Sequence, residues 1–377
     1  MTTQLAIVAN TSWYIYNFRL NLAKSLIEKG ATVYAVAPID SYSEQLEKNG
    51  VVHVPWRLTP TGTNPLIELG SILSLRRTLR FLNIDTVLSY TPKGNVYSGL
   101  AIYGTRTRIL PNISGLGTAF NKGVVAKHSI IALYRIAFTR AERIFFQNED
   151  DRETFRKAGV APHVPTERLM GSGVDLARFS LSPLPSIASP GRAITFLFVG
   201  RLLWEKGIQE YVDAARAVKR TNNNVRFLVL GNLLPPHPRA VSKQQLQDWC
   251  GEGAIEYLGT TDDVPSVLKE VDCMVLPSFY KEGVPRTLIE AAAMGRPIIT
   301  TDVPGCRDVV NGANGWVCEP RNTVDLTNKI QAFLNLDVES RARMGKSSHE
   351  LARKVFDEKN VIESYMQALF LPKMSSR

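Results

Sequence analysis

The sequence has few cysteines and histidines, and their spacing is not that of disulfide-bonded pairs or metal ligands. Four cysteines are spread over 377 residues without close pairs, and five histidines are scattered. This usage is typical of reduced thiols in a cytoplasmic protein and argues against a disulfide framework or a zinc site. No Asp-x-Asp run suited to Mg²⁺ is present, so we expect no metal and no other cofactor.

Long apolar runs are also missing. No stretch reaches the ~18 uninterrupted apolar residues of a membrane-spanning helix. The opening MTTQLAIVAN has neither a basic region nor a cleavage site, so we interpret it as a first strand and not as a signal peptide. Apolar content is 44% and charged content 21%, which is ordinary for a globular protein.

Acidic residues are scarce in the first half of the chain. Residues 1–170 hold 20 Lys and Arg against 12 Asp and Glu, and residues 76–143 hold 11 basic residues against Asp85 and Glu142. The N-terminal half is therefore expected to face something anionic, such as a phosphorylated ligand, nucleic acid or an acidic membrane surface. The alternative is a solvated basic face without a partner.

Short apolar strands alternate with amphipathic helices along the whole chain. Strands are expected at 5–9, 32–37, 51–56, 85–90, 106–112 and 143–148, and again at 193–200, 225–231, 255–259, 272–278 and 297–301. Helices are expected at 18–30, 207–220, 285–294, 323–335 and 339–371. This α/β alternation predicts two tandem doubly wound, Rossmann-like domains with parallel sheets.

A Ser- and Pro-rich stretch, SLSPLPSIASPG, separates the two halves and is interpreted as a linker. The predicted organisation is a first domain at 1–180, a linker at 181–192 and a second domain at 193–355, followed by a C-terminal segment at 356–377. In doubly wound sheets ligands bind beyond the carboxyl ends of the strands, so the loops that follow strands are the candidate sites.

The loop after the strand at 193–200 reads GRLLWEKG. Arg201 and Lys206 flank Glu205 there and precede a helix that begins near Gly207. A guanidinium and an ammonium beside a helix N-terminus form a candidate diphosphate site, in which Glu205 would orient one cation. An ordinary charged surface loop is the alternative.

The stretch EGVPRTLIEAAAMGRP carries two glutamates eight positions apart. Glu282 lies in the turn with Gly283, Val284 and Pro285, ahead of a helix whose first-turn N–H groups can meet ligand oxygens. Glu290 lies among apolar helix residues, where a lone carboxylate needs a partner, and it can accept the hydroxyls of a ribose. The alternatives are a helix-dipole role for Glu282 and a solvated position for Glu290.

Together with GSGVDLARF, NGANGWVCEP and EYLGTTDDVPSVLKEVDCMVLPS, these motifs resemble the retaining glycosyltransferases of family 4, which have the GT-B fold. The resemblance covers nearly the whole chain. It implies that Arg201 and Lys206 bind the donor diphosphate, that Glu282 contacts the transferred sugar and acts with them in catalysis, and that Glu290 binds the ribose. It also implies that the last helix crosses back onto the N-terminal domain.

The N-terminal motifs YTPKGNVYSGLAIYG and PNISGLGTAF resemble those of enzymes that extend sugars on a polyprenyl diphosphate. This likeness implies a UDP-sugar donor, a lipid-linked saccharide acceptor in bacterial surface glycan or glycoprotein glycan assembly, and a cytoplasmic protein peripheral to the inner face of the membrane. The acceptor-binding candidates are Asn10, Arg19, Lys93, Ser114, Gly115 and Gly117. Ordinary strand–helix turn chemistry is the alternative for Lys93 and for the SGLG loop.

The apolar segment 123–146, with interleaved Lys127, Arg135, Arg140 and Arg143, is interpreted as a core helix or a membrane contact.

Two features depart from the family pattern. The usual Gly-Gly turn after the first strand is replaced by ANTSWYIYNFR, and no histidine stands in the loop 111–118, where Ser114 takes its place. A nucleotide-sugar 2-epimerase on the same scaffold, a transferase with a soluble acceptor and a non-catalytic nucleotide or nucleic-acid binding module stay open as rivals. No helix-turn-helix or aromatic stacking pattern favours nucleic acid.

Overall fold

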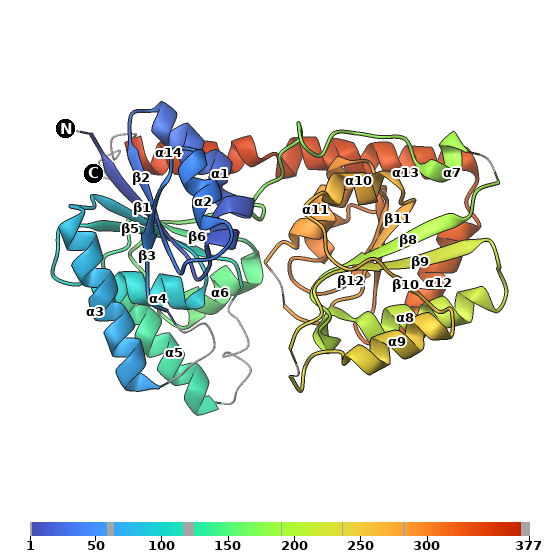
Figure 1. Ribbon diagram of the computed structural model, residues 1–377, viewed down its shortest axis with the longest axis horizontal. Helices are drawn as coiled ribbons and strands as arrows, with labels where there is room; N and C mark the ends of the chain where they lie inside the picture. The colour runs from blue at the N-terminus through green and yellow to red at the C-terminus, as the bar shows by residue number, and fades with distance from the viewer. Residues whose placement is uncertain are drawn as a thin grey trace. The chain divides into compact units, whose positions relative to one another are not determined.

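The computed structural model describes residues 2–58, 64–115, 124–189, 191–235, 237–281 and 283–370. The chain divides into two compact units (Figure 1). The first comprises the chain up to Ser172 together with the segment from Val361, and the second comprises Gly173–Asn360. The predicted linker 181–192 thus falls inside the second unit. Each unit is built on one parallel sheet, which confirms the predicted pair of doubly wound α/β domains.

The sheet of the first unit has the strand order β3-β2-β1-β4-β5-β6-β7. Its strands are mostly fully buried, because helices cover both faces. They are β1 (Gln4–Val8), β2 (Thr32–Ala37), β3 (Val52–Pro55), β4 (Thr86–Ser89), β5 (Arg108–Ile113), β6 (Ile144–Phe146) and β7 (Thr166–Arg168).

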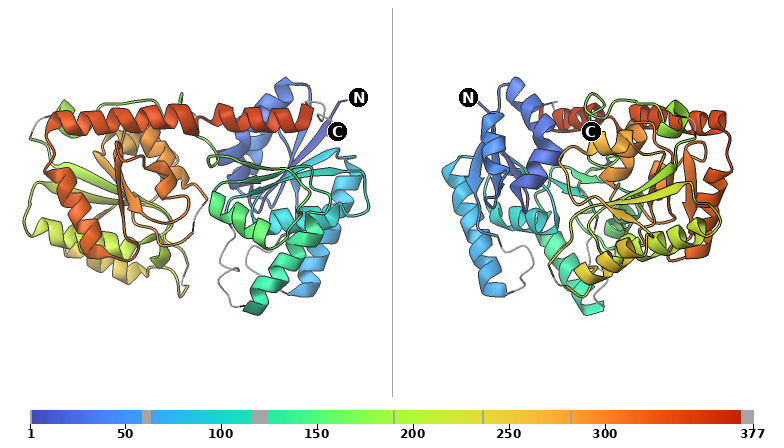
Figure 2. Two further views of the ribbon diagram at one scale, coloured as in Figure 1. Left: turned by 180° about the vertical axis from the view of Figure 1, so that it is seen from behind. Right: turned by 45° about the vertical axis from the view of Figure 1, so that its right-hand side comes forward.

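Two separate apolar cores flank this sheet. One core packs α3 (Pro65–Phe81), α4 (Pro92–Ala101), α5 (Val124–Ala137) and α6 (Glu149–Lys157) against one face. The other packs α1 (Ser12–Glu28), α2 (Ser43–Lys48) and α14 (Glu358–Phe370) against the opposite face. Val361, Tyr365 and Leu369 of α14 are buried in that second core, so the end of the chain completes the first unit (Figure 2).

The sheet of the second unit has the order β10-β9-β8-β11-β12-β13. Its strands are β8 (Ile194–Val199), β9 (Val225–Leu230), β10 (Glu256–Tyr257), β11 (Cys273–Leu276), β12 (Ile298–Thr301) and β13 (Gly315–Cys318). The helices are α7 (Pro185–Ala188), α8 (Ile208–Lys219), α9 (Lys243–Gly251), α10 (Val264–Lys269), α11 (Arg286–Ala293), α12 (Thr323–Leu334) and α13 (Val338–Leu351).

Several predicted element boundaries are wrong. The first helix begins at Ser12 and not at 18, because Thr11 caps it by accepting a hydrogen bond from the Tyr14 N–H. Its buried face carries Arg19 together with Ile15, Leu22 and Leu26. The helices predicted at 339–371 are α13 and α14, with a π-helical turn (Ala352–Phe356) and Asp357 between them. Segment 124–146 holds α5 and then β6, which lies within the strand predicted at 143–148, whereas β7 and β13 were not predicted.

Arg296 explains how the Ser- and Pro-rich segment is held. Its guanidinium is wholly buried and donates hydrogen bonds to carbonyl oxygens of Ser182, Pro183, Val271 and Met294. Burial lowers the pKa of Arg296 to about 10, which still leaves it charged at neutral pH. The predicted linker is therefore bound to the second unit.

The four cysteines are free thiols, as expected, and three of them are buried.

Candidate functional site

The strand order of the second unit places a topological switch point between β8 and β11. From β8 the chain proceeds to β9 and β10 on one side, and from β11 to β12 and β13 on the other. A crevice opens at the carboxyl ends of the two central strands of such a sheet, and ligands bind there. The two charged motifs found in the sequence follow β8 and β11 directly, so both occupy this edge.

Hydrogen bonds join these two loops. The Phe279 N–H donates to the Glu205 carbonyl over 3.0 Å, and the Ser278 hydroxyl donates to the same oxygen over 3.2 Å. Gly207 makes the approach possible. It adopts φ +77°, and a Cβ at this position would lie 2.0 Å from the Pro277 carbonyl oxygen. Only glycine fits here, because both the backbone conformation and the space exclude a side chain.

The cations of the first loop have distinct surroundings. Arg201 is exposed directly beyond Gly200, and Lys206 is half-buried at the end of the short 3₁₀ turn Trp204–Lys206. Glu205 does not pair with either of them, contrary to the prediction that it orients one. Its carboxylate instead forms an ion pair with Arg239, whose carbonyl also accepts the Trp204 N–H.

Arg239 is a candidate residue that the sequence reasoning missed. It comes from the loop after β9, the strand beside β8, and so a third cation joins the edge that holds Arg201 and Lys206. The signal that could have identified Arg239 is its position after a buried strand that is followed directly by Gly231. The segment NLLPPHP between Gly231 and Arg239 shows no charge pattern of its own.

The second loop leads into α11. Gly283, Val284 and Pro285 are buried, and Pro285 is the residue that precedes the helix and not its first turn. No side-chain hydrogen bond is made at the N-cap of α11, and the Leu288 N–H of its first turn donates to the Pro285 carbonyl over 3.1 Å. Glu282 lies outside the described residues, and its proposed contact with the transferred sugar stays a prediction.

Glu290 has the partner that a buried carboxylate needs. It is 8% exposed, and the Arg286 guanidinium, one turn earlier, donates to its Oε1 over 2.8 Å. Burial raises the pKa of Glu290, and the charge of Arg286 partly opposes that rise. The solvated-residue alternative for Glu290 is wrong. Its role in ribose binding stays a prediction.

In the first unit the switch point lies between β1 and β4. Asn10 follows β1, Lys93 follows β4, and Ser114 and Gly115 follow β5, which brings these acceptor candidates to one edge of the sheet. Gly117 lies outside the described residues. Lys93 is held there by an ion pair of 2.6 Å with Glu68 of α3, and Tyr97 donates its hydroxyl hydrogen to the other oxygen of that carboxylate.

Arg19 stands apart from the other acceptor candidates because it is only 2% exposed. Its guanidinium lies 4.3 Å from the ring centre of Tyr90 and 3.4 Å from the Tyr14 hydroxyl oxygen. Burial acts to lower the pKa of Arg19, but the surrounding tyrosines outweigh it and raise the pKa. Arg19 thus lies beneath the edge where Asn10 and Ser114 stand.

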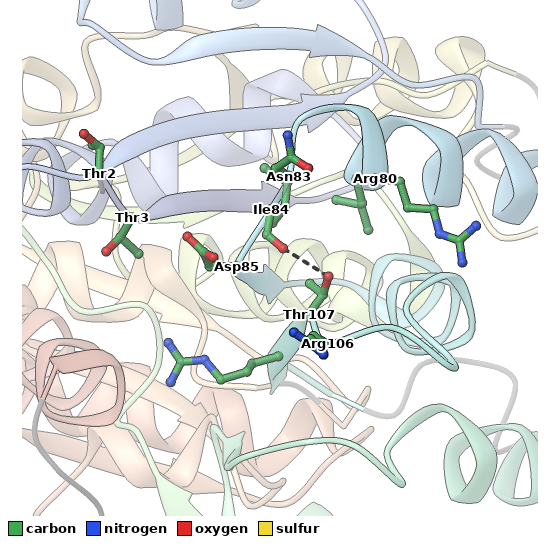
Figure 3. Close-up of a pocket in the computed structure, with 10 residues that line it drawn as sticks. Thr2, Thr3, Arg80, Asn83, Ile84, Asp85, Arg106 and Thr107 are labelled. Atoms are coloured by element: carbon green, nitrogen blue, oxygen red, sulfur yellow. Dashed lines mark hydrogen bonds between the residues drawn. The ribbon is translucent and has the colours of Figure 1, made fainter.

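One sizeable pocket of the first unit lies at the opposite edge of its sheet. Its volume is about 660 Å³, and it is lined by Thr3, Asp85, Thr107 and neighbouring residues that precede β1, β4 and β5 (Figure 3). Because parallel sheets bind ligands at the carboxyl ends of their strands, we do not assign this pocket to the site. In the described part of the chain no three His, Cys, Asp or Glu side chains gather as a metal site would require.

Two family models match most of the chain. The model "Glycosyl transferase 4-like" matches residues 4–148, and the model "Glycosyl transferases group 1" matches residues 193–335. Each match falls within one of the two structural units. The second match contains the loops after β8 and β11.

Individual relatives extend this picture. The chain is 27% identical to the N,N'-diacetylbacillosaminyl-diphospho-undecaprenol alpha-1,3-N-acetylgalactosaminyltransferase of Campylobacter jejuni, over 94% of each chain. It is 28% identical to the putative colanic acid biosynthesis glycosyltransferase WcaL of Escherichia coli, over 54% of this chain and 52% of that one. The crystal structure of Anabaena HepE in complex with UDP superposes with a TM-score of 0.79 at 18% identity, over 98% of this chain and 99% of that one.

Proposed function

Because this chain belongs to the glycosyltransferases described by the 4-like and group 1 models and has their GT-B fold, we propose a specific transfer reaction for it. The donor is a UDP-hexose or UDP-N-acetylhexosamine, and the acceptor is a saccharide linked to a polyprenyl diphosphate. The product is an intermediate of a bacterial surface glycan or glycoprotein glycan, made at the cytoplasmic face of the membrane.

One observation carries the donor half of this proposal. The loops after β8 and β11 are hydrogen-bonded to each other at the switch point. Arg201 and Lys206 of the loop after β8, joined by Arg239 of the loop after β9, lie at the edge where α11 begins. Cations beside the N-terminus of a helix at one crevice suit a nucleoside diphosphate. The UDP bound in the structure of HepE, which has the same fold, supports UDP as the nucleotide.

The chemistry follows from where charge develops. As the bond from the anomeric carbon to the leaving phosphate breaks, negative charge grows on the diphosphate and positive charge on the sugar ring. Arg201 and Lys206 stabilise the diphosphate, and each such contact lowers the barrier by ~3 kcal/mol. They take the role that a divalent metal fills in other transferases. We propose that the leaving phosphate accepts the acceptor's proton on the same face, which gives retention of configuration.

The acceptor half rests on the Campylobacter relative, whose name describes transfer to a saccharide on undecaprenyl diphosphate. Its alignment covers 94% of this chain, more than either unit alone holds, and the edge of the first unit carries Asn10, Lys93 and Ser114. We propose that this edge receives the acceptor sugar. Among the described residues, no helix is both long and apolar enough to cross a bilayer.

Transfer of label into lipid tests the proposal. Purified protein is mixed with detergent-solubilised bacterial lipid-linked saccharides and radiolabelled UDP- and GDP-sugars, and label in the organic phase is counted. We expect label from one UDP-sugar, lost in Glu282→Ala and Glu290→Ala. Label only in a water-soluble product would refute the lipid acceptor. Conversion of the donor to its epimer without transfer would establish the isomerase instead.

A further inference from the structure

Helix α3 presents an apolar face to solvent. Sixteen large apolar side chains are exposed in the described part of the chain, and five of them belong to this one helix: Leu66, Ile67, Leu69, Leu73 and Phe81. Exposed apolar residues elsewhere are scattered singly or in pairs, which is ordinary for a globular surface. A cluster on one helix is not, and it marks an interaction surface.

The helical spacing sorts these side chains into a stripe. Leu66, Leu69, Leu73, Arg77 and Arg80 recur every three or four residues and so share one face, which we call the α3 stripe. The opposite face carries Ser71, Leu75 and Leu79, which are buried against the sheet. The three leucines of the stripe are 80%, 52% and 45% exposed, and both arginines are exposed beside them.

The stripe carries positive charge without acidic residues. The one acid of α3, Glu68, points away from it toward Lys93 and Tyr97. Arg77 also lines a cavity of about 940 Å³ at one side of the helix, together with Ile67 of α3 and with Ile39, Arg57 and Leu58 beyond the ends of β2 and β3. Apolar side chains and two arginines thus line one recess, a combination that suits a phosphate headgroup above acyl chains.

The same layer of helices carries a second pair of exposed apolar residues. Helices α3, α4 and α5 form one layer over the same face of the sheet (Figures 1 and 2). On α5, Leu133 and Ile136 are exposed at a spacing of three, with the exposed Arg135 between them. This is the region, residues 76–143, in which basic residues far outnumber acidic ones.

We propose that the α3 stripe docks this protein on an anionic lipid bilayer, with its leucines in the headgroup–acyl boundary and Arg77 and Arg80 against lipid phosphates. A helix of 17 residues with three arginines lies in the interface and does not cross it. A second copy of the chain fits less well, because a two-fold contact through the stripe would bury Arg77 and Arg80 with no acidic residue of the stripe to pair with them. The reason for docking rests on the proposed function, since the proposed polyprenyl diphosphate acceptor is embedded in a membrane.

Vesicle flotation of the full chain tests the surface without any acceptor lipid. We expect binding to phosphatidylcholine vesicles that contain phosphatidylglycerol, little binding to pure phosphatidylcholine, and loss of binding as salt rises. Absence of binding to the anionic vesicles at low salt would overturn the proposal.

Variants locate the contact. Leu66→Gln/Leu69→Gln/Leu73→Gln should lower vesicle partitioning at least tenfold, and Arg77→Gln/Arg80→Gln should remove the preference for anionic lipid. Val324→Gln/Val338→Gln changes two exposed valines of the second unit and serves as the matched control, which should bind as the unsubstituted protein does. Circular dichroism checks that each variant is folded. Unchanged vesicle binding of the leucine variant would refute the assignment of the stripe to the membrane. A solution mass half that of the unsubstituted protein would also refute it, because the stripe would then be a dimer interface.

A fluorescence measurement stands independently of these losses. Leu69→Trp should show a blue-shifted emission with anionic vesicles and quenching by brominated acyl chains, whereas Val324→Trp should show neither. No shift at position 69 would contradict insertion. Transfer measured in detergent separates the two proposals: failed docking with intact transfer refutes only the stripe, and docking without transfer refutes only the reaction.

Discussion

At the scale of single residues, the buried charge of Glu290 reduces the stability of the fold. Its pKa is raised by burial despite the ion pair with Arg286. A carboxyl whose pKa is raised on folding binds its proton more tightly in the folded state. Stability is therefore lost as pH rises from the ordinary glutamate range through the raised pKa.

Glu290→Gln removes this cost. We expect its thermal midpoint, relative to the unsubstituted protein, to rise as pH goes from about 4 to 7. Under the proposed ribose contact, transfer is lost as well, because the amide offers one acceptor oxygen in place of two. Differential scanning calorimetry across this range, with transfer assayed in parallel, checks both effects. A variant that is destabilised more at neutral pH than at acid pH would show that the ion pair outweighs the burial.

Glu205 and Arg239 make a second residue-scale prediction. Arg239→Met leaves the carboxylate of Glu205 unpaired beside the proposed diphosphate, and we expect the donor KM to rise about tenfold through like-charge repulsion. Glu205→Gln/Arg239→Met should recover part of that loss. Steady-state kinetics of both single variants and the double variant measure the coupling. Additive effects in this cycle would mean that Glu205 and Arg239 act on the donor independently and not as a pair.

Sequence patterns predicted the positions of Arg201, Lys206 and Glu290 after strands or within a helix, because glycine turns and apolar runs are local signals. They did not predict the partners. Whether Glu205 pairs with Lys206 or with Arg239 depends on how the loop after β9 returns to β8, and Arg286 was named only as part of the motif. Arg19 could not be placed beneath the site from its sequence, since an arginine on an apolar helix face is rare.

At the scale of elements, the joined loops depend on Gly207. Gly253 is a matched control, because it adopts φ +73° but has nothing within 4 Å of a built Cβ. Gly253→Ala should cost about 1 kcal/mol for the backbone conformation alone. Gly207→Ala should cost roughly 3 kcal/mol or more, because the added carbon also collides with Pro277. It should weaken UDP binding as well.

Urea denaturation and calorimetric titration with UDP compare these two glycine variants. Equal costs for the two would show that the loops separate without penalty. Contacts between loops are not visible in sequence patterns, and neither are the ends of helices. The apolar period predicts the body of α8 or α11. The helix ends at Thr11, Pro285 and Asp357 depend instead on capping and on non-helical backbone, which leave no apolar period.

At the scale of the whole molecule, the last helix stabilises the first unit. Tyr365 is wholly buried, packs 4.6 Å from Phe145 between ring centres, and accepts a hydrogen bond of 3.0 Å from Asn112. Tyr365→Ala should therefore lower the free energy of unfolding by about 3–5 kcal/mol. Phe370→Ala, at an exposed position of the same helix, should change it little.

Urea unfolding followed by circular dichroism measures the effect of Tyr365→Ala. Since two units need not unfold together, the transition is expected to split when the first unit is weakened. Equal stability of the two α14 variants would mean that the helix adds nothing to the unit it covers.

The placement of α14 in the first unit also has a consequence during synthesis on the ribosome. Strands β1 to β7 emerge first, but Val361, Tyr365 and Leu369, which cover one face of their sheet, are translated after the entire second unit. Until α14 is translated, part of the apolar surface of the first unit stays uncovered. Chaperones bind such exposed surface on nascent chains. A polypeptide released early would keep that surface exposed, so proteolysis can distinguish finished chains from unfinished ones.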